Sequence, residues 1–512
     1  MKKGFFNVLV ILLLVLSLGL VGYASAGEPE YADQIVIGKL GDAAYLDPNQ
    51  AVGVSEITIT QQIYQGLVEP SEDCKGIVPC LATDWTISDN ALVYTFNLRP
   101  GIKFSDGSPV KGEDWEWSLI RARDAETSGY RFAAEPIKDV VADDKTVTIT
   151  LNEPSASFLG NLCMFNLTVG CKAHWDAVGE QEYSLQPLGT GPYMLKEWKK
   201  EEYIILEKNP NYWKEGVPFT NELKYKVIGD DNTRSLQLQS GDIDVMMDVP
   251  FSMISQLKSN DKITTYTFPS TQIRYFVLNT TTEPLDNQKV RQAIGMAINK
   301  EELADIVAWG LGKPAESLLS DTQVQWFSNN LKYNAYDVEG AKALLTEAGY
   351  PDGINFTISV RAGSQVYEQI AVILKSQLAE AGIDVVIELL ERASLSEKYQ
   401  SLTHQATILQ WLDDFPDPSG IMNWTVDYDQ SYAWYTGLND VELDEFNAKA
   451  NRELDLEKRV AMYNEIQQRI YDNANVIPLF SNVFAWAASD KVENLMVTPF
   501  YKQLTENLKM RK

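Results

Sequence analysis

The spacing of hydrophobic residues differs between the first and the second part of the chain. Apolar and polar residues alternate over 92–98, as in a half-buried strand, and a hairpin follows the Gly-rich segment at 189–193. After residue 287 helices alternate with strands, which is typical of a wound α/β domain. The expected strands are 34–40, 92–98, 193–198, 203–207, 354–360, 383–389 and 406–411, and the expected helices are 55–65, 113–123, 288–299, 337–348, 365–381, 440–450 and 457–472.

A chain of 512 residues is too long for one hydrophobic core, so two or three domains are expected. We find no internal repeat and no low-complexity linker in the sequence. Domain boundaries are therefore expected at short crossovers, as a hinged protein requires, and not at a flexible tether.

The first 26 residues have the three parts of a secretory signal. Lysines at positions 2 and 3 precede an apolar run over 5–21, and Ala24-Ser25-Ala26 then predicts cleavage after Ala26. A membrane anchor is the weaker interpretation, because Asn7, Ser17 and Gly19 interrupt a run that is barely long enough to span a bilayer. No Cys follows the cleavage site to carry a lipid. We expect a periplasmic protein.

The net charge of −27 gives information about binding partners and not about the fold. Such a charge repels nucleic acid and anionic lipid surfaces, so neither is expected as a partner. Solubility alone is sufficient to explain the charge. No ligand follows from it.

Four cysteines in an exported chain suggest disulfides, and three pairings are possible. We favour the two local pairs, Cys74 with Cys80 and Cys163 with Cys171, because each closes a short loop. A four-thiolate zinc site would need tighter spacing within each pair. The cysteines are therefore interpreted as structural.

Catalytic patterns are absent from the sequence. The two histidines, His174 and His404, lie in no zinc-binding motif, and no Gly-x-Ser-x-Gly occurs. The Gly-rich segment 189–193 precedes a strand and lacks the Lys and Ser or Thr of a phosphate loop. We expect a protein that is not an enzyme and that binds no metal or cofactor. Paired carboxylates are too common here to exclude an exported hydrolase by counting.

The segment after the expected strand 406–411 is the strongest candidate for a site. It contains Trp411, Asp413, Asp414 and Asp417, together with the prolines at 416 and 418. Ligands of open α/β sheets bind beyond the carboxyl ends of strands, and an acid held there can receive the amine of a peptide. Position alone, however, favours turn formation and helix capping for these aspartates.

Several blocks along the chain resemble the extracytoplasmic solute-binding proteins that serve peptide ABC importers. Their order and spacing carry the resemblance, since each block is weak alone. The blocks are Leu46-Asp47-Pro48, Tyr64-Gln65-Gly66-Leu67, Leu81-Ala82-Thr83-Asp84-Trp85, Lys103-Phe104-Ser105-Asp106-Gly107, Gly189-Thr190-Gly191-Pro192-Tyr193, Asn209-Pro210-Asn211-Tyr212-Trp213, Ser240-Gly241-Asp242, Val290-Arg291-Gln292-Ala293, Glu347-Ala348-Gly349-Tyr350 and Ile477-Pro478-Leu479.

The resemblance implies a periplasmic-binding-protein-like α/β fold of two hinged lobes with an inserted α+β domain. Domain I would comprise 27–64, 189–271 and 484–512, domain II would be 65–188, and domain III would be 272–483. The hinge would be the two crossovers near 271 and 483, with the ligand between domains I and III. It also implies a monomer that delivers a peptide to ABC permease subunits. Both cysteine pairs fall in domain II, so their loss should affect stability more than affinity.

The resemblance also implies the ligand contacts. Asp414 matches the aspartate that binds the peptide amine in the family. The peptide would lie between two backbone segments and form main-chain hydrogen bonds. The remaining contacts would come from Gln410, Leu412, Val52, Gly53 and Val54 through their backbone, and from Trp411 and Tyr130 through their rings.

Arg361 matches the arginine that holds the ligand carboxylate in dipeptide-binding members. It ends the strand 354–360 and precedes a helix N-terminus, which also favours an anion. The alternative is a surface arginine paired with an acid. If Arg361 points away, longer peptides fit and Arg274 becomes the candidate. Phe415-Pro416 departs from the family pattern and leaves ligand length open.

Aromatic residues gather near the same loop. Most are expected in the core or between domains. Stacking platforms also suit sugars, so an oligosaccharide receptor of the same family stays an alternative. The residues are Trp424, Tyr428, Tyr432, Trp434 and Tyr435.

Overall fold

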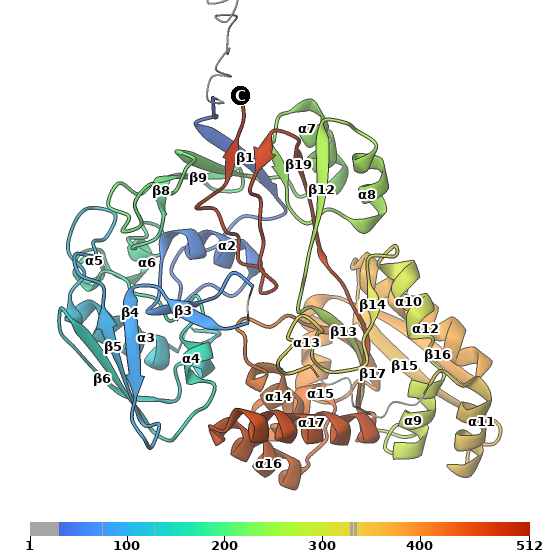
Figure 1. The fold of residues 1–512 in the computed structure, drawn as a ribbon. Coiled ribbons are helices and arrows are strands. Elements are labelled where there is room, and N and C mark those ends of the chain that lie inside the picture. Colours follow the sequence, from blue (N-terminus) through green and yellow to red (C-terminus); the bar gives the residue numbers. More distant parts are fainter. Residues whose placement is uncertain (1–29, 74, 127, 328–330, 332–334) are drawn as a thin grey trace, which may run out of the picture.

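A computed structural model describes residues 30–512 except 74, 127, 328–330 and 332–334. The predicted signal segment and Cys74 lie outside the described residues. Three sheets of four or more strands organise the rest, each with its own hydrophobic cluster (Figure 1). The predicted α/β class with hinged lobes is confirmed.

The first sheet gathers strands from both ends of the chain. Its order is β12, β19, β11, β1, β10, β9, β8, and β1 lies parallel to both β10 and β11. Alternate residues such as Ile35 and Ile37 are buried, as expected for strands with one face on the core. Its elements are β1 (Gln34–Lys39), α2 (Val54–Ile63), β8 (Tyr193–Lys199), β9 (Tyr203–Lys208), β10 (Glu222–Val227), α7 (Asp231–Ser240), β11 (Val245–Met246), α8 (Phe251–Lys258), β12 (Ile263–Phe268) and β19 (Phe484–Ser489).

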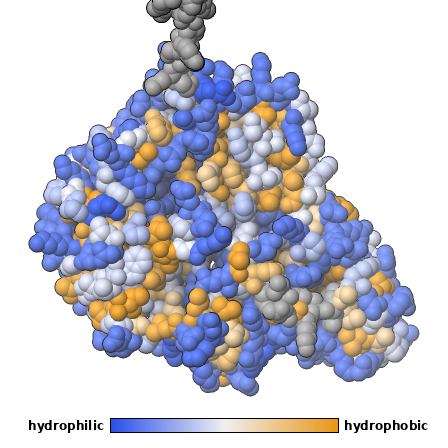
Figure 2. All heavy atoms as spheres, in the orientation of Figure 1, coloured by the Kyte–Doolittle hydropathy of each residue, from blue (hydrophilic) through white to orange (hydrophobic). Residues whose placement is uncertain are grey.

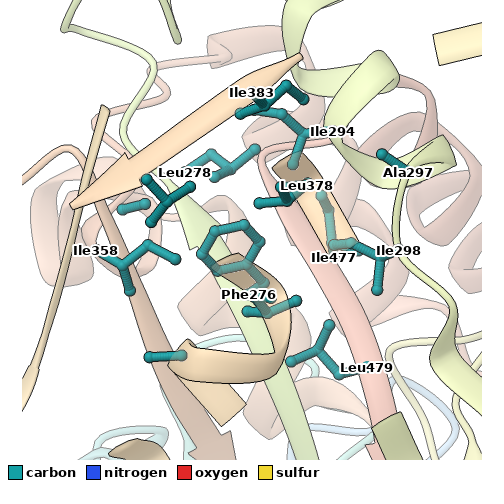
Figure 3. Close-up of a cluster of buried hydrophobic side chains, with 14 of the residues drawn as sticks. Phe276, Leu278, Ile294, Ala297, Ile298, Ile358, Leu378, Ile383, Ile477 and Leu479 are labelled. Atoms are coloured by element: carbon teal, nitrogen blue, oxygen red, sulfur yellow. The ribbon is translucent and has the colours of Figure 1, made fainter. Parts of the chain in front are cut away.

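The second sheet is the predicted wound α/β unit. Its order is β14, β18, β13, β17, β15, β16, with β15 parallel to β16 and β17. One face packs on helices through the cluster drawn in Figure 3, in which Phe276, Ile358 and Leu479 meet. The elements are β13 (Ile273–Leu278), α9 (Gln288–Met296), α10 (Lys300–Val307), β14 (Lys313–Pro314), α11 (Val338–Glu347), β15 (Ile354–Arg361), α12 (Gln365–Glu380), β16 (Ile383–Leu390), β17 (Ala406–Trp411) and β18 (Val476–Ser481).

The other face of this sheet packs on the last group of helices. Ile273, Tyr275 and Val277 alternate with the residues of the opposite face and lie in a cluster with Trp434 and Tyr463. Because helices cover both faces of this sheet, the sequence of β13 is an almost continuous apolar run. The helices are α13 (Arg392–Gln400), α14 (Ser419–Val426), α15 (Tyr428–Tyr435), α16 (Val441–Arg452) and α17 (Leu456–Asn473).

The third unit lies between α2 and β8 in the sequence. Its four strands are all antiparallel in the order β4, β5, β7, β6, and Trp115, Phe96 and Phe158 fill its core. The elements are β2 (Val68–Pro70), β3 (Ile77–Pro79), β4 (Ala82–Ile87), β5 (Val93–Leu98), α3 (Gly112–Asp124), η1 (Arg131–Ala133), β6 (Ile137–Ala142), β7 (Thr146–Leu151), α4 (Phe158–Asn161), α5 (Lys172–Val178) and α6 (Glu180–Tyr183).

The chain crosses between the two larger sheets at two short segments. Residues 269–272 join β12 to β13, and residues 482–483 join β18 to β19. The two crossovers lie side by side, because the backbone N–H of Asn482 donates to the Gln272 carbonyl at 3.4 Å. The C-terminal segment then returns to the first sheet and ends in the hairpin β20 (Val492–Glu493) and β21 (Lys509–Met510).

Neither predicted disulfide is confirmed, and Cys74 of the first pair lies outside the described residues. In the described part of the chain Cys80 and Cys171 carry free thiols. Cys80 lies opposite Leu67 at the base of the β2–β3 hairpin, with its side chain in the core. Cys171 begins α5, and an intervening β-bridge joins Gly66 to Thr168.

Hydrophilic residues cover most of the face shown in Figure 2. Within the described ranges, no helix is both long and apolar enough to cross a membrane.

Candidate functional site

The loop after β17 carries three aspartates in three different environments. Asp417 forms a buried ion pair with Arg459, with both oxygens engaged at 2.6 and 2.8 Å, and it also caps α14 through the backbone of Ser419 at 3.0 Å. Asp413 is buried and accepts a hydrogen bond from Trp411 Nε1 at 2.8 Å. Of these two, Asp417 has the expected capping role, whereas Asp413 accepts from an indole N–H.

Asp414 differs from its neighbours because no described residue forms a hydrogen bond or an ion pair with its carboxylate. The residue is half-buried, and this burial raises the pKa of its carboxyl to about 7. The pKa of Asp413 is raised to about 8, first by burial and further by the nearby charges of Asp414 and Asp417. Asp414 is therefore a desolvated acid that lacks a cation.

A cavity of about 400 Å³ opens beside Asp414. Helix α2 lines it with Gln61, Gln62 and Gln65, the β2–β3 hairpin lines a second side, and the C-terminal segment 494–507 lines a third. Asp414 belongs to the second sheet's loop, so this cavity lies where all three units meet.

Four half-buried charged residues of the cavity neutralise one another. Glu69 lies 3.0 Å from Lys502 and 3.7 Å from Lys214, and Glu506 lies 3.0 Å from Lys214. Burial opposes ionisation of Glu69, but the two lysines outweigh it and hold the pKa of this carboxyl below its usual value. Sequence reasoning missed this network because its bonded partners lie far apart in sequence, 433 residues for Glu69 and Lys502.

Tyr130 and Val52 meet near the same loop. Burial raises the pKa of the Tyr130 hydroxyl, and the negative charge of Asp414 raises it further, so the two side chains are close. A Cβ placed on Gly129 would lie 3.0 Å from Val52 Cγ1, so the segment before α2 adjoins the inserted unit here. Two predicted contacts from separate units are thus brought toward Asp414.

Residues 52–54, expected to contact the peptide through their backbone, lie at the start of α2. Val54 is the first residue of α2, and Gly53 caps this helix. The Gly53 N–H is bonded to the Glu56 side chain at 3.1 Å, and the same carboxylate also accepts from Ala44 N–H at 3.0 Å. Gly53 keeps an extended backbone (φ −123°, ψ 161°) as the N-cap of α2, and Val52, which is 62% exposed, precedes it as irregular backbone.

Strand β17 leaves part of its backbone unpaired on one side. It pairs with β13 along its whole length, from Ala406 to Trp411. On the other side its pairing with β15 comprises Ala406 and Thr407 alone. The edge that runs through Gln410 to Leu412 is therefore open to another extended chain.

Arg361 and Arg274 have opposite environments. Arg361 ends β15, is exposed and forms no ion pair with any residue in the described ranges. Arg274 lies on β13 opposite Gln410 and is half-buried. Its Nε and Nη1 atoms are buried without a hydrogen-bond partner, and its guanidinium lies 5.5 Å from the Tyr367 ring centroid.

The aromatic residues near the loop mostly pack on one another. Trp411 contacts Trp424 and Trp434 with ring centroids 5.8 and 5.9 Å apart, and Trp434 also packs on Tyr275 at 5.1 Å. Packing of these rings on one another leaves less ring surface for a sugar platform, which weakens the oligosaccharide alternative.

The loop also anchors itself in both other units. Phe415 is 3% exposed and belongs to the hydrophobic cluster of the inserted unit. Leu412 packs against the cluster of the first sheet. The sequence showed Phe415 only as a departure from the family pattern, because the partners of an apolar loop residue cannot be identified from local periodicity.

No group of three or more His, Cys, Asp and Glu side chains in the described residues is arranged to hold a metal ion. His174 contacts the Gln186 carbonyl at 2.9 Å, and His404 is buried.

Comparisons with known proteins bear on the whole chain. A family model described as "Bacterial extracellular solute-binding proteins, family 5 Middle" matches residues 76–433. The glutathione-binding protein GsiB of Pectobacterium atrosepticum is 28% identical over 489 residues, which cover 93% of this chain and 94% of the relative.

Solved structures agree with this match. The periplasmic binding protein DppA of Helicobacter pylori in complex with the peptide STSA has a TM-score of 0.80 and 28% identity, over 94% of this chain and 99% of that one. A dipeptide-binding protein of Pseudoalteromonas sp. SM9913 in complex with Met-Leu has a TM-score of 0.81 and 26% identity, over 94% and 100%. This chain belongs to family 5 of the bacterial extracellular solute-binding proteins.

Proposed function

We propose that this protein is a periplasmic receptor that encloses a short peptide and delivers it to an ABC importer. The family match and the solved relatives with bound peptides support this proposal. The protein would be exported by the signal segment, cleaved after Ala26, and would act as a monomer without catalysis. Domain I (27–64, 189–271, 484–512) and domain III (272–483) would be the lobes, and domain II (65–188) the insertion.

The observation that carries the proposal is the unpartnered carboxylate of Asp414. A peptide amine would supply the missing cation and form a charge-assisted hydrogen bond in a desolvated place. The paired state of Asp413 and Asp417 leaves Asp414 as the acid of this loop that is free to take it. The pKa of about 7 means that burial disfavours the charged form of Asp414 when no ligand is bound.

The open edge of β17 would bind the peptide backbone. An extended ligand beside Gln410 and Leu412 would add a strand and gain affinity without reading side chains. Val52 would contact it from the other lobe, and Trp411 and Tyr130 would bound the space around its first residue. Gly53 and Val54 would take part through their position at the start of α2.

The test is calorimetric titration of trialanine into an Asp414→Asn variant. Loss of the charge should weaken binding by about 2–5 kcal/mol, the range for removing one partner of a buried charged pair. Glu72→Gln is the matched control, because Glu72 is an exposed acid that lines the same cavity. Equal affinity in wild type and Asp414→Asn would contradict the assignment.

A hydrolase is separated from a receptor by incubation with a defined peptide mixture. A receptor returns every peptide uncut, and mass spectrometry of the protein fraction detects those it retained. Cleavage products that increase with time would contradict the receptor assignment.

A further inference from the structure

Thr271 lies in the first crossover and is hydrogen-bonded on both sides of it. Its backbone N–H donates to the Pro499 carbonyl at 3.1 Å, and its hydroxyl donates to the same oxygen at 3.3 Å. The hydroxyl oxygen also accepts the backbone N–H of Asp413 at 3.1 Å. Thr271 is 2% exposed, so solvent does not compete for these bonds. One side chain therefore joins the C-terminal segment, the crossover and the loop that carries Asp414.

The register of the second sheet explains why Thr271 meets this loop. Strands β13 and β17 are antiparallel, and hydrogen-bonded pairs alternate with non-bonded pairs along such a ladder. Asn279, just after β13, donates its N–H to the Gln405 carbonyl, and counting every second pair from there makes Thr271 and Asp413 the next bonded position beyond the end of β17. At this position a side-chain hydroxyl accepts the N–H in place of a main-chain carbonyl.

The bond to Thr271 fixes the backbone directly before Asp414. Of the main-chain groups of residues 412–414, the Asp413 N–H alone is hydrogen-bonded to another described residue. The Cα atoms of Asp413 and Asp414 are about 3.8 Å apart, as across any trans peptide. A displacement of the Asp413 backbone therefore displaces the Asp414 carboxylate, which has no bond of its own to hold it.

We propose that Thr271 is a positioning residue for the carboxylate of Asp414. The inference rests on the proposed function and deepens it, because the hydroxyl holds the loop where a peptide amine would meet this carboxylate. The same hydroxyl is bonded to Pro499, so the loop is held in this way while the C-terminal segment lies against the crossover. An amine bound to Asp414 therefore favours that arrangement of the units.

Thr322 offers a matched control on the same crossover. Its hydroxyl lies 3.4 Å from the Ser270 carbonyl and 3.0 Å from Ser320 Oγ. It is thus a second threonine that is hydrogen-bonded to the crossover, and its printed partners lie outside the loop 411–418. Loss of this hydroxyl disturbs the crossover and leaves the bond to Asp413 in place.

Calorimetry of Thr271→Val with trialanine and propionyl-Ala-Ala, which is trialanine without its amine, tests the inference. Valine keeps the shape of threonine but cannot accept the Asp413 N–H, so the loop must move for this N–H to reach water. Trialanine should bind about tenfold more weakly, which corresponds to about 1.4 kcal/mol. The affinity for propionyl-Ala-Ala should change by less than about twofold.

The control variants keep the wild-type preference for the amine. Thr271→Ser retains the hydroxyl, and Thr322→Val retains the bond to Asp413, so both should bind the two ligands as wild type does. An equal loss of both ligands in Thr271→Val would indicate a merely structural role and would overturn the inference. Unchanged affinity for trialanine would overturn it as well.

Two further measurements separate the causes of failure. Thr271→Ala is a second variant without the hydroxyl and should show the same tenfold loss, which keeps the test decisive if valine prevents folding. Combined with Asp414→Asn, Thr271→Val should cost no further affinity for trialanine, since the carboxylate that it positions is gone. Equal binding of both ligands by wild type would contradict the proposed function itself. A wild-type preference for trialanine that both hydroxyl-free variants keep would overturn the role of Thr271 and leave the proposed function intact.

Discussion

Three aspartates within five positions illustrate how partners decide the role of a residue. Asp417 is neutralised by Arg459, which lies 42 residues away in sequence. Asp413 takes a hydrogen bond from Trp411, two residues before it. Asp414 has no partner among the described residues and adjoins the cavity. The sequence showed three acids in a turn, and the difference between them comes from contacts that are not local.

The ion pair between Asp417 and Arg459 should be essential for stability. Replacement of Arg459 by Met leaves a buried carboxylate without its cation, which costs about 3–5 kcal/mol of the free energy of unfolding. Urea denaturation measures this loss. Arg452→Met is the matched control, because its pair with Glu153 is about half exposed and should contribute less than about 1 kcal/mol. Similar losses in both variants would contradict this account.

Asp414 should destabilise the unliganded protein at neutral pH. Its folded pKa of about 7 lies above the unfolded value, so the folded state takes up the proton first as pH falls. This contribution makes the protein more stable as pH decreases from 8 to 5, and Asp414→Asn should remove that part of the slope. Melting curves at several pH values measure it. An unchanged slope in the variant would show that Asp414 is not desolvated.

At the scale of elements, the sequence predicted what depends on local periodicity. Strand 406–411 and helix 457–472 were predicted within one residue of β17 and α17 because their apolar period is regular. The site could not be predicted from local periodicity alone. The open edge of β17 depends on where β15 stops pairing, which lies 48 residues away. The backbone of residues 52–54 depends on the start of α2, where the Glu56 carboxylate accepts the Gly53 N–H.

The sequence predicted some candidate residues better than others, again because non-local contacts are not visible in it. Asp414 was reached through its position after a strand and a family resemblance, and its unpaired state agrees with the predicted role. The cysteine pairings are not confirmed, and spacing along the chain does not fix distance in space. Arg274 could be proposed only as a substitute, since burial without a partner is visible in a structure alone.

The open edge of β17 makes a prediction about ligands. If the peptide backbone bonds to Gln410 and Leu412, methylation of one ligand amide that points at this edge should weaken binding by about 0.5–1.5 kcal/mol, the net value of one hydrogen bond. Trialanine methylated singly at each amide, measured by calorimetry, gives this profile. Equal affinity of every methylated form would contradict main-chain recognition.

Phe415 should hold the loop of Asp414 against the inserted unit. Phe415→Ala removes a side chain that is 3% exposed in the cluster of that unit, and a loss of about 3–5 kcal/mol is typical of such a change. Phe415 joins the loop of the second sheet to the inserted unit, so its loss should also let the two units separate. The radius of gyration of the unliganded protein in small-angle X-ray scattering should then increase. Phe158→Ala is the control from within the unit and should lower the melting temperature without expansion. A wild-type radius for Phe415→Ala would count against the anchor.

For the whole molecule, the loop 411–418 is the point at which three cores meet. Leu412 packs on the first sheet's cluster, Phe415 on that of the inserted unit, and Asp417 on Arg459 below the second sheet. A ligand bound at Asp414 would therefore contact all three units at once. Such a ligand favours the arrangement in which the units are together, because it has its full set of contacts only there.

The most direct test of the central claim is a thermodynamic cycle between Asp414 and the ligand amine. Calorimetry gives the affinity of trialanine and of propionyl-Ala-Ala for wild type and for Asp414→Asn. We predict that removal of the amine costs wild type about 2–5 kcal/mol and costs the variant almost nothing. An equal loss in both proteins would show that the amine binds elsewhere and would contradict the account.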